Sequence, residues 1–598
     1  MQLAKKNLKE LWGYDSFLPL QEQAIENVLR GKDSVVVLPT GSGKSVCYQL
    51  PILGMDGMAL VISPLISLMK DQVDALLEIG VPAARFDSML SKKEQDRVLE
   101  QITNKSLKIL YISPERILSG LIQEKLGNTT VSYIAIDEAH CISIWGHDFR
   151  QDYRELRGLR KTFPEAAFHA FTATATPKVR ADIAHQLLME SPEYVVGSCD
   201  RPNLIYKIER QAKRVQQIAS TLESHPGESG IIYCITRKAV DALSAALNDR
   251  EFQTVTYHAG MPDKDRIRNQ EAWLEEQVDI IVATVAFGMG IDKSNVRFVI
   301  HAGMPLSIDN YQQESGRAGR DGLEARCYLF YSARDYRTWK FILQNDDGEV
   351  DEIALSKLNA IANFCAGVAC RHRAIMEYFG EKMLAASCQA CDVCLGDVDI
   401  MEGAFVVSQK ILSAIKRVQE NFGAHYVASV LVGSNAQRIQ DNGHHTQTTF
   451  GLLSDYKVGA VRNWIEQLVT QNFIEKTSDY DILKVTESGL ELLRGRADMQ
   501  PVLLTAARGR PKYSRAASDK WSGVNQDLFQ LLRKLRSEIA KEKYMPAFIV
   551  FGDATLRDIA TRVPVTASEF LDVSGVGPKK LEQYGERFID VVKRHLEV

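Results

Sequence analysis

The chain contains the stretch Leu38-Pro39-Thr40-Gly41-Ser42-Gly43-Lys44-Ser45, which carries its strongest structural signal. An apolar run, Ser34–Leu38, leads into it and predicts a buried strand, and a helix-like segment opens at Ser45. A strand, a glycine-rich turn and a helix in this order aim backbone N–H groups and a helix N-terminus at phosphate oxygens. Leu38 replaces the first glycine of the usual G-x-x-x-x-G-K-[ST] pattern, so a plain loop is the alternative interpretation.

The side chains of this loop predict nucleotide binding. Lys44 is expected to reach the β- and γ-phosphates, and the Ser45 hydroxyl is expected to bind Mg²⁺. The residues expected to contact the nucleotide are Thr40, Gly41, Ser42, Gly43, Lys44 and Ser45.

Two acidic residues about ninety positions later supply the other half of a hydrolytic site. The strand-like run Val131–Ile136 ends in Asp137-Glu138-Ala139-His140. Asp137 suits a Mg²⁺ ligand, because this ion takes few protein carboxylates together with substrate phosphates. Glu138 is placed to orient or deprotonate an attacking water. An acidic turn at a strand end is the alternative, but its position after a phosphate loop favours hydrolysis of a nucleoside triphosphate.

Composition limits the class of protein. The 598 residues include 72 basic and 76 acidic side chains, so nucleic-acid binding depends on local patches rather than on net charge. We find no signal-like N-terminus and no apolar run of membrane-spanning length, which predicts a soluble, cytoplasmic protein without a membrane partner. The ten cysteines do not form a disulfide pattern, because four cluster and the others are scattered.

Strand-like and helix-like segments alternate in two series, which predicts an α/β fold with two parallel sheets flanked by helices. The second series begins after Asp200-Arg201-Pro202-Asn203 and has no phosphate loop of its own. The expected strands are Ser34–Leu38, Ala59–Ser63, Leu107–Ser113, Tyr133–Asp137 and Ala167–Thr172 in the first series, and Gly230–Cys234, Thr254–Tyr257, Asp279–Ala283, Arg297–His301 and Arg326–Tyr331 in the second.

The second series ends in an arginine-containing segment, Gln312–Gly322. Arg317 and Arg320 are spaced to lie on one side of a helical turn. Facing the γ-phosphate from a second lobe, they would act as arginine fingers and make hydrolysis depend on closure of the cleft. A solvated basic helix is the alternative, and the position after an ATPase lobe disfavours it.

These motifs together resemble the superfamily 2 helicases and, within them, the bacterial-type RecQ family of ATP-dependent DNA helicases. Further motifs that carry the resemblance are Leu18–Gln23, Ser63–Gln72, Thr172–Thr174 and Thr284–Lys293. The resemblance implies two tandem RecA-like lobes, a zinc-binding helical module, a winged-helix domain and a small helical HRDC domain. The expected bounds are 1–200 for the ATP-binding lobe, 201–335 for the second lobe, 336–400 for the zinc-binding module, 401–500 for the winged helix, 501–520 for a basic linker and 521–598 for the HRDC domain.

The family pattern also implies an adenine contact before the first strand. Gln21 is the better candidate for that contact and Gln23 the other. Leu18 departs from the pattern, since family members usually carry Arg there, so selectivity for adenine is less strongly implied than triphosphate binding.

An aromatic stretch directly follows Asp137–His140. Trp145, Phe149 and Tyr153 recur every four residues. A core helix with an aromatic stripe is one interpretation. The interspersed charges favour a loop that stacks bases of single-stranded DNA. It resembles the RecQ family's aromatic-rich loop, which senses bound DNA and triggers hydrolysis. The residues assigned to DNA are Trp145, His147, Phe149 and Arg150.

Four cysteines predict a metal site. Cys388, Cys391 and Cys394 form a tight knuckle, and Cys370 lies upstream. Four thiolates without a spare ligand suit structural Zn²⁺, and the RecQ-like zinc module has this arrangement. An iron–sulfur cluster is the competing interpretation, but no fourth Cys-Pro follows the knuckle.

The C-terminal tail resembles the HRDC domain, an auxiliary nucleic-acid-binding module. Leu528, Leu531, Leu532, Leu535 and Ile539 fall on one helical face. Phe548 and Lys579 are its candidate DNA contacts, although the segment Pro546–Phe551 fits core packing equally well.

The sequence as a whole predicts an ATP-driven helicase that uses Mg²⁺ and contains Zn²⁺. The resemblance implies 3′→5′ movement on single-stranded DNA, unwinding of forked or duplex DNA, and a role in recombination and repair. A monomer in the nucleoid, with single-strand-binding and recombination proteins as partners, is the expected setting. An RNA helicase and a non-enzymatic binder of DNA structures are the alternatives.

Overall fold

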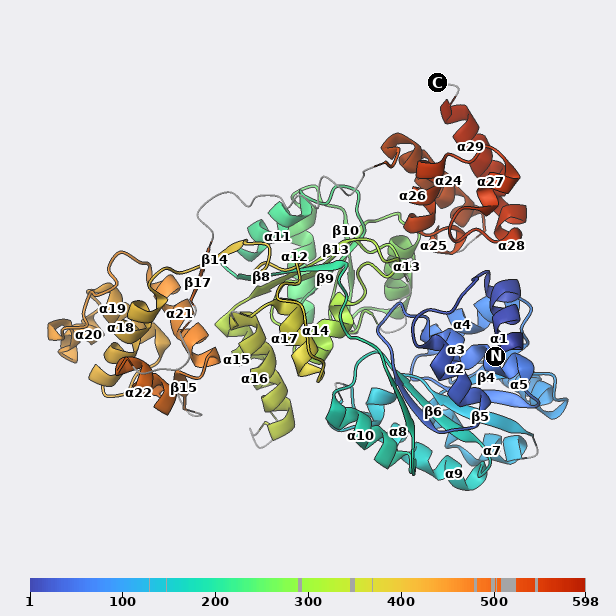
Figure 1. Ribbon diagram of the computed structural model, residues 1–598, viewed down its shortest axis with the longest axis horizontal. Coiled ribbons are helices and arrows are strands. Elements are labelled where there is room, and N and C mark those ends of the chain that lie inside the picture. Colours follow the sequence, from blue (N-terminus) through green and yellow to red (C-terminus); the bar gives the residue numbers. More distant parts are fainter. Residues whose placement is uncertain are drawn as a thin grey trace. The chain divides into compact units, whose positions relative to one another are not determined.

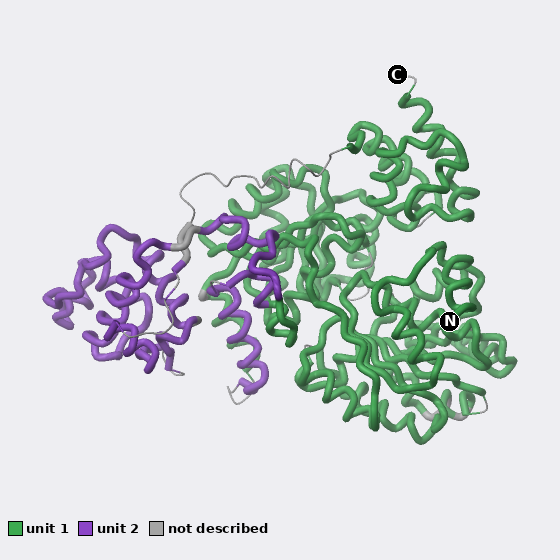
Figure 2. Tube along the Cα trace, viewed as in Figure 1, with its two compact units in different colours: residues 1–344, 375–383, 518–598 green, residues 345–374, 384–517 purple. Residues whose placement is uncertain are grey.

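We describe a computed structural model of the chain, in which the described residues are 1–127, 129–146, 148–288, 293–344, 350–367, 369–477, 481–495, 501, 503–506, 523–543 and 547–596. The chain forms two compact units, shown in green and purple in Figure 2. Unit 1 comprises residues 1–344, 375–383 and 518–598, and unit 2 comprises residues 345–374 and 384–517. Each unit is described by itself below.

Unit 1 contains two parallel sheets (Figure 1). The first has the order β3-β4-β2-β5-β6-β1-β7 and the second the order β10-β11-β9-β12-β13-β8, and every pairing in them is parallel. The strands are β1 (Ser34–Val37), β2 (Met58–Ile62), β3 (Ala83–Phe86), β4 (Ile109–Ile112), β5 (Val131–Ile136), β6 (Ala167–Thr172), β7 (Glu193–Val196), β8 (Leu204–Arg210), β9 (Gly230–Tyr233), β10 (Thr254–Tyr257), β11 (Ile280–Ala283), β12 (Phe298–His301) and β13 (Ala325–Tyr331). This confirms the predicted α/β fold class.

Helices surround both sheets (Figure 1). Those of the two lobes are α1 (Gln2–Asn7), α2 (Gln21–Leu29), α3 (Lys44–Gln49), α4 (Ile66–Glu78), α5 (Lys92–Thr103), α6 (Pro114–Ile117), α7 (Gly120–Gly127), α8 (Gln151–Glu155), α9 (Leu159–Thr162), α10 (Pro177–Gln186), α11 (Arg214–Leu222), α12 (Arg237–Asn248), α13 (Asp263–Leu274), α14 (Ile308–Ser315) and α15 (Ala333–Ile342). The C-terminal helices are α24 (Gln526–Glu542), α25 (Ala547–Val550), α26 (Asp553–Arg562), α27 (Ala567–Leu571), α28 (Pro578–Lys580) and α29 (Glu586–Leu596).

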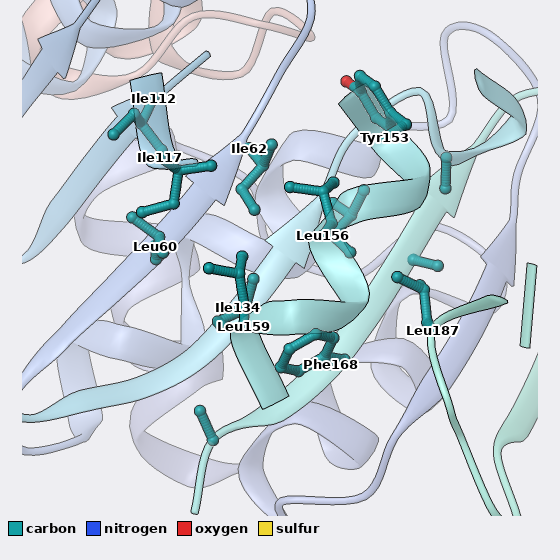
Figure 3. Packing of buried hydrophobic residues seen from close by; sticks show 14 of the residues in the cluster. Leu60, Ile62, Ile112, Ile117, Ile134, Tyr153, Leu156, Leu159, Phe168 and Leu187 are labelled. Atoms are coloured by element: carbon teal, nitrogen blue, oxygen red, sulfur yellow. The ribbon is translucent and has the colours of Figure 1, made fainter. Parts of the chain in front are cut away.

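The inner strands are buried on both faces, because helices cover each side of a parallel sheet. Their near-continuous apolar runs follow from that burial. Figure 3 shows one face of the first sheet, where Leu159 lies beside Ile134 and Phe168, and Leu60 and Leu156 belong to the same buried cluster. This core fixes the carboxyl ends of the strands, at which the candidate site lies.

The expected strands of both series are present, with ends shifted by a few residues. Three further strands, β3, β7 and β8, were not expected. All three lie at the edges of their sheets, and each contains a charged residue, Arg85, Glu193 or Lys207, that interrupts its apolar run.

Unit 2 is mainly helical and has its own apolar core. Its elements are α16 (Glu352–Ala366), the start of α17 (Arg371–Tyr378), β14 (Val398–Ile400), α18 (Ala404–Arg417), α19 (Ala424–Val432), α20 (Gln437–Asp441), α21 (Val458–Thr470), β15 (Ile474–Lys476), β16 (Leu483–Val485), α22 (Glu487–Leu493) and β17 (Leu504–Ala506). The pairs β15–β16 and β14–β17 are antiparallel. Most of the predicted basic linker, 501–520, lies outside the described residues. Within the described ranges, none of the helices has the length and apolar character needed to span a membrane.

Candidate functional site

The phosphate loop joins β1 to α3 at the carboxyl edge of the first sheet. Gly41 and Gly43 both have positive φ angles, 87° and 68°, which favour glycine. A Cβ atom on Gly43 would lie 2.5 Å from Gln21 Nε2, so this position needs glycine for space as well. The loop therefore keeps its shape through two glycines and a neighbouring glutamine.

Gln21 is attached to the phosphate loop. It lies at the start of α2, where its Nε2 donates to the carbonyls of Ser42 at 2.9 Å and Gly43 at 3.2 Å. Its Oε1 accepts a hydrogen bond from the backbone N–H of Leu18 at 2.8 Å. Gln23 is exposed on the same helix. The structure thus brings Gln21, and not Gln23, to the loop.

Lys44 begins α3 and turns back over the loop. Its Nζ donates to the carbonyl oxygens of Leu38 at 3.1 Å and Pro39 at 3.5 Å. Burial lowers the pKa of Lys44, and the carboxylates of Glu138 and Asp137 oppose that shift. The predicted cation and the two predicted acids therefore lie close enough to interact.

Asp137 and Glu138 directly follow β5. Asp137 is buried, and burial together with the neighbouring Glu138 raises its pKa to about 7. Two adjacent carboxyl groups that repel each other form a donor set that a divalent cation would stabilise. The site's acids therefore fit the predicted Mg²⁺.

Arg317 and Arg320 lie in the tight turns that follow α14, which ends at Ser315. Gly316 ends the helix, and the next residues form successive tight turns. The Arg317 guanidinium donates to the carbonyl of Gly288. The backbone of Arg320 lies against the phosphate loop: a Cβ on Gly41 would be 3.4 Å from Arg320 O. The charge of Arg320 also contributes to the lowered pKa of Lys44.

The aromatic stretch is a loop followed by a short helix, α8. Phe149 is 39% exposed, and Arg154 lies 5.3 Å from its ring centre. Trp145 is half-buried beneath Lys178 Nζ, 3.0 Å from its ring centre. Arg150 pairs with Asp148 at 2.9 Å. His147 lies outside the described residues.

Tyr153 differs from the other aromatic residues of this stretch. It is fully buried, and its hydroxyl donates to the carbonyl of Asp137 at 3.1 Å (Figure 3 shows its ring in the core). Tyr153 therefore connects the end of the aromatic stretch to the acidic pair through a buried hydrogen bond.

The four cysteines of unit 2 converge. The sulfur atoms of Cys370, Cys388, Cys391 and Cys394 all lie within 4.8 Å of one another. Sulfur atoms about 2.3 Å from one tetrahedral Zn²⁺ would be about 3.8 Å apart, so the cluster fits a single ion. Arg371 braces the knuckle: its Nε and Nη2 donate to Asp392 at 2.8 and 3.1 Å.

Models of known protein families match successive segments of the chain from its first lobe to its C-terminal helices. Five family models match: DEAD/DEAH box helicase at residues 18–183, helicase conserved C-terminal domain at 212–322, RecQ zinc-binding at 333–395, RQC domain at 401–508 and HRDC domain at 525–592. The chain is 41% identical to the ATP-dependent DNA helicase RecQ of Pasteurella multocida, over 100% of this chain and 94% of that protein. The chain belongs to the RecQ family of ATP-dependent DNA helicases.

Two other RecQ helicases have similar coverage. The protein of Haemophilus influenzae is 40% identical over 98% of this chain and 95% of its own length. That of Bacillus subtilis is 38% identical over 99% and 98%. The predicted family and enzyme class are therefore confirmed, and ATP is the nucleotide of this family.

The HRDC segment of this RecQ-family chain has a separate helical core. Leu528, Leu532, Leu535 and Ile539 are buried as expected, whereas Leu531 is 45% exposed. Phe548 is half-buried on α25, and Lys579 donates to the carbonyl of Glu78.

Sequence reasoning missed one buried charge cluster in unit 1. Arg536 on α24 is fully buried and donates to Glu276 at 3.0 Å and to Asp553 at 2.7 Å. Lys293 Nζ lies 3.6 Å from Glu276. These charges are scattered over the sequence as single residues, so no local pattern marks them.

His140 was named in a motif but assigned no role. Its Nδ1 lies 3.0 Å from Thr172 Oγ1 and 3.3 Å from Glu138 Oε2, which links the ends of β5 and β6. The place of both residues in motifs that carry the family resemblance, Asp137–His140 and Thr172–Thr174, was the available signal.

Proposed function

We propose that this protein is an ATP-dependent 3′→5′ DNA helicase that couples ATP hydrolysis to movement along single-stranded DNA and to duplex unwinding. One observation carries the proposal: the turn that holds Arg317 and Arg320, on the second sheet, meets the phosphate loop of the first sheet. A nucleotide bound there touches both lobes. Opening and closing of the two lobes then accompanies each hydrolysis cycle.

Each site residue has a distinct task in this proposal. Lys44 exchanges its loop carbonyls for the β- and γ-phosphates, and Ser45 and Asp137 hold Mg²⁺. Glu138 orients the attacking water, and its carboxylate is held by His140 at 3.3 Å. Arg317 and Arg320 stabilise the charge on the transferred phosphoryl group. Gln21 contacts adenine, and the remaining phosphate contacts come from residues 40–43.

The two metals have separate roles. Mg²⁺ supplies charge neutralisation for the triphosphate when bound. Zn²⁺ supplies four metal–thiolate bonds that hold Cys370 to the knuckle Cys388–Cys394. Metal analysis of the purified protein is expected to give about one zinc per chain. An iron-containing, coloured preparation would contradict the zinc assignment and favour the iron–sulfur cluster.

DNA binding is assigned to three regions. Phe149, Trp145, His147 and Arg150 form a base-stacking and phosphate-binding loop. Phe548 and Lys579 contribute auxiliary contacts from the HRDC segment. The winged helix within unit 2 grips the duplex ahead of the fork.

The proposal includes the domain bounds and the cellular setting of the protein. The domain bounds are those expected from the sequence, from the ATP-binding lobe at 1–200 to the HRDC domain at 521–598. The protein acts as a monomer in recombination and repair at the nucleoid, with single-strand-binding and recombination proteins as partners.

Strand displacement tests the proposal. Duplexes with a 3′ or a 5′ single-stranded tail are incubated with and without ATP, beside RNA duplexes of the same sequence. We expect ATP-dependent unwinding of the 3′-tailed DNA. Lys44→Ala should abolish unwinding while most DNA affinity remains, because phosphate contacts elsewhere carry binding. Unwinding by Lys44→Ala, or preference for the 5′ tail or for RNA, would contradict the proposal.

A further inference from the structure

Arg201 lies in the connection between the two sheets of unit 1, three residues before β8. Its guanidinium donates to four backbone carbonyls. Nη1 donates to Thr40 O at 3.1 Å and to Gly316 O at 3.2 Å. Nη2 donates to Ala318 O at 3.1 Å and to Gly319 O at 2.8 Å.

These acceptors belong to two different parts of the site. Thr40 is in the phosphate loop on the first sheet, whereas 316–319 is the turn that carries Arg317 and sits just before Arg320. One side chain therefore contacts both halves of the composite nucleotide site. Only a planar, forked cation can donate in several in-plane directions at once.

Carbonyl acceptors carry no full negative charge, so Arg201 makes these bonds without forming an ion pair there. Burial lowers the pKa of Arg201, yet a guanidinium remains protonated in proteins. The charge of Arg201 thus persists beside the nucleotide site, adding to the positive field of Arg320 and Lys44.

The turn has further attachments besides its bonds to Arg201. One of them, Asn203, itself accepts a bond from Arg201 Nε on its Oδ1 at 3.4 Å. Asn203 Nδ2 donates to the carbonyls of Gly319 and Leu323, both at 2.9 Å. The N–H of Gly319 donates to Val296 O at 2.9 Å, and Arg297 pairs with Asp321 at 2.6 Å. The bond to Val296 and the Arg297–Asp321 pair therefore hold the turn to its own sheet without Arg201, whereas the Arg201 bond to Thr40 joins the turn to the phosphate loop.

We propose that Arg201 is a positioning residue that couples the phosphate loop to the arginine turn, by bonding Thr40 O and the 316–319 carbonyls with one guanidinium. It sets the distance between Lys44 and Arg320 at which hydrolysis proceeds. This inference rests on the proposed function, because it assumes that Arg317 and Arg320 act on the phosphate held by Lys44.

The test compares Arg201→Gln and Arg201→Lys in the full-length protein. Single-stranded-DNA-stimulated ATP hydrolysis gives kcat and KM, and a fluorescent ATP analogue gives nucleotide affinity. Arg201→Gln is expected to lower kcat by about tenfold or more, equivalent to about 1.4 kcal/mol in the barrier. KM and nucleotide affinity should change less than about threefold, because Lys44 and the loop amides still hold the phosphates.

The conservative variant separates positioning from charge. Arg201→Lys keeps the cation but loses the fork, so its kcat should lie between those of Arg201→Gln and the unchanged protein. Arg250→Gln is the matched control, since Arg250 is exposed in the turn after α12 and donates to one carbonyl of that helix, Ala246 O. Its kcat should equal that of the unchanged protein.

Each result has a defined meaning. An unchanged kcat in Arg201→Gln overturns the inference. So does a fall in kcat that is matched by a lower melting temperature or by an equal loss of nucleotide affinity, since that indicates a structural role. If the unchanged protein lacks DNA-stimulated ATP hydrolysis, the proposed function fails instead. The rate measured with Lys44→Ala gives the background against which the absence of hydrolysis is judged.

Discussion

Removal of Arg371 should destabilise the four-cysteine knuckle strongly. Arg371 and Asp392 have side chains that are each 4% exposed, and two hydrogen bonds of 2.8 and 3.1 Å join them. Arg371 also donates to the carbonyls of Phe364 at 3.1 Å and Gly367 at 2.9 Å, which ties the knuckle to the end of α16. Arg371→Ala would leave the Asp392 carboxylate buried without its guanidinium.

The expected magnitude follows from that burial. Breaking a buried ion pair by deleting one partner costs about 3–5 kcal/mol, because the remaining charge stays desolvated. Replacing both partners by apolar residues costs less, so Arg371→Met with Asp392→Leu should be more stable than Arg371→Ala. Loss of the two carbonyl contacts prevents full recovery in the double variant.

Metal release during urea unfolding measures the effect. A chromophoric chelator reports the release of zinc from unit 2. The urea concentration at which half of the zinc is released should be clearly lower for Arg371→Ala than for the unchanged protein. Arg373→Ala is the control, since the half-buried Arg373 donates to the carbonyls of Ala385 at 2.8 Å and Ala386 at 3.4 Å rather than to a buried carboxylate, and its free energy of unfolding should change by only about 1 kcal/mol. Equal midpoints for Arg371→Ala and Arg373→Ala would refute the reasoning.

Four other predictions concern unit 1. Burial raises the pKa of Glu276, but its basic neighbours, Arg536 first, outweigh burial and hold that pKa well below its usual range. The ionised Glu276 should therefore stabilise the folded protein fully above about pH 5, and this stabilisation should decline as the pH falls below about 4. Glu276→Gln should flatten this pH dependence of the melting temperature. Gly43→Ala should weaken nucleotide binding by about tenfold or more in a fluorescence titration, because the new Cβ displaces Gln21, whereas native affinity would contradict the loop geometry. Phe149→Ala should weaken single-stranded DNA binding by about 1–3 kcal/mol at unchanged melting temperature. Tyr153→Ala should instead lower the melting temperature, because it removes about 3–5 kcal/mol of core packing, and the reverse pattern would disprove the assigned roles.

The sequence predicted the parts of the molecule that local patterns encode. Buried parallel strands read as apolar runs, so β1, β5 and β6 were found, and the phosphate loop followed from its glycines. The edge strands β3 and β7 were missed because an open edge does not require an apolar run. The spacing of Arg317 and Arg320 did not show that α14 ends at Gly316, just before them, so that both lie in the turns after the helix.

Long-range polar contacts could not be predicted in this way. Arg201 meets Thr40 across 161 positions, and Arg536 meets Glu276 across 260. Each is an ordinary charged residue in its local sequence, and its partner is defined only by the fold. Tyr153 shows the same limit: its spacing matched the aromatic loop, but the chain turns it into the core.

The resting position of Lys44 affects how tightly ATP is held. The ammonium of Lys44 already donates hydrogen bonds to Leu38 O and Pro39 O. Phosphate binding would therefore replace two existing hydrogen bonds and would not add bonds to an unpaired donor. Such an exchange moderates the net gain from each phosphate contact. The same two carbonyls can accept the ammonium again when the nucleotide leaves, so the departure of the phosphates does not leave Lys44 as a buried cation without hydrogen bonds.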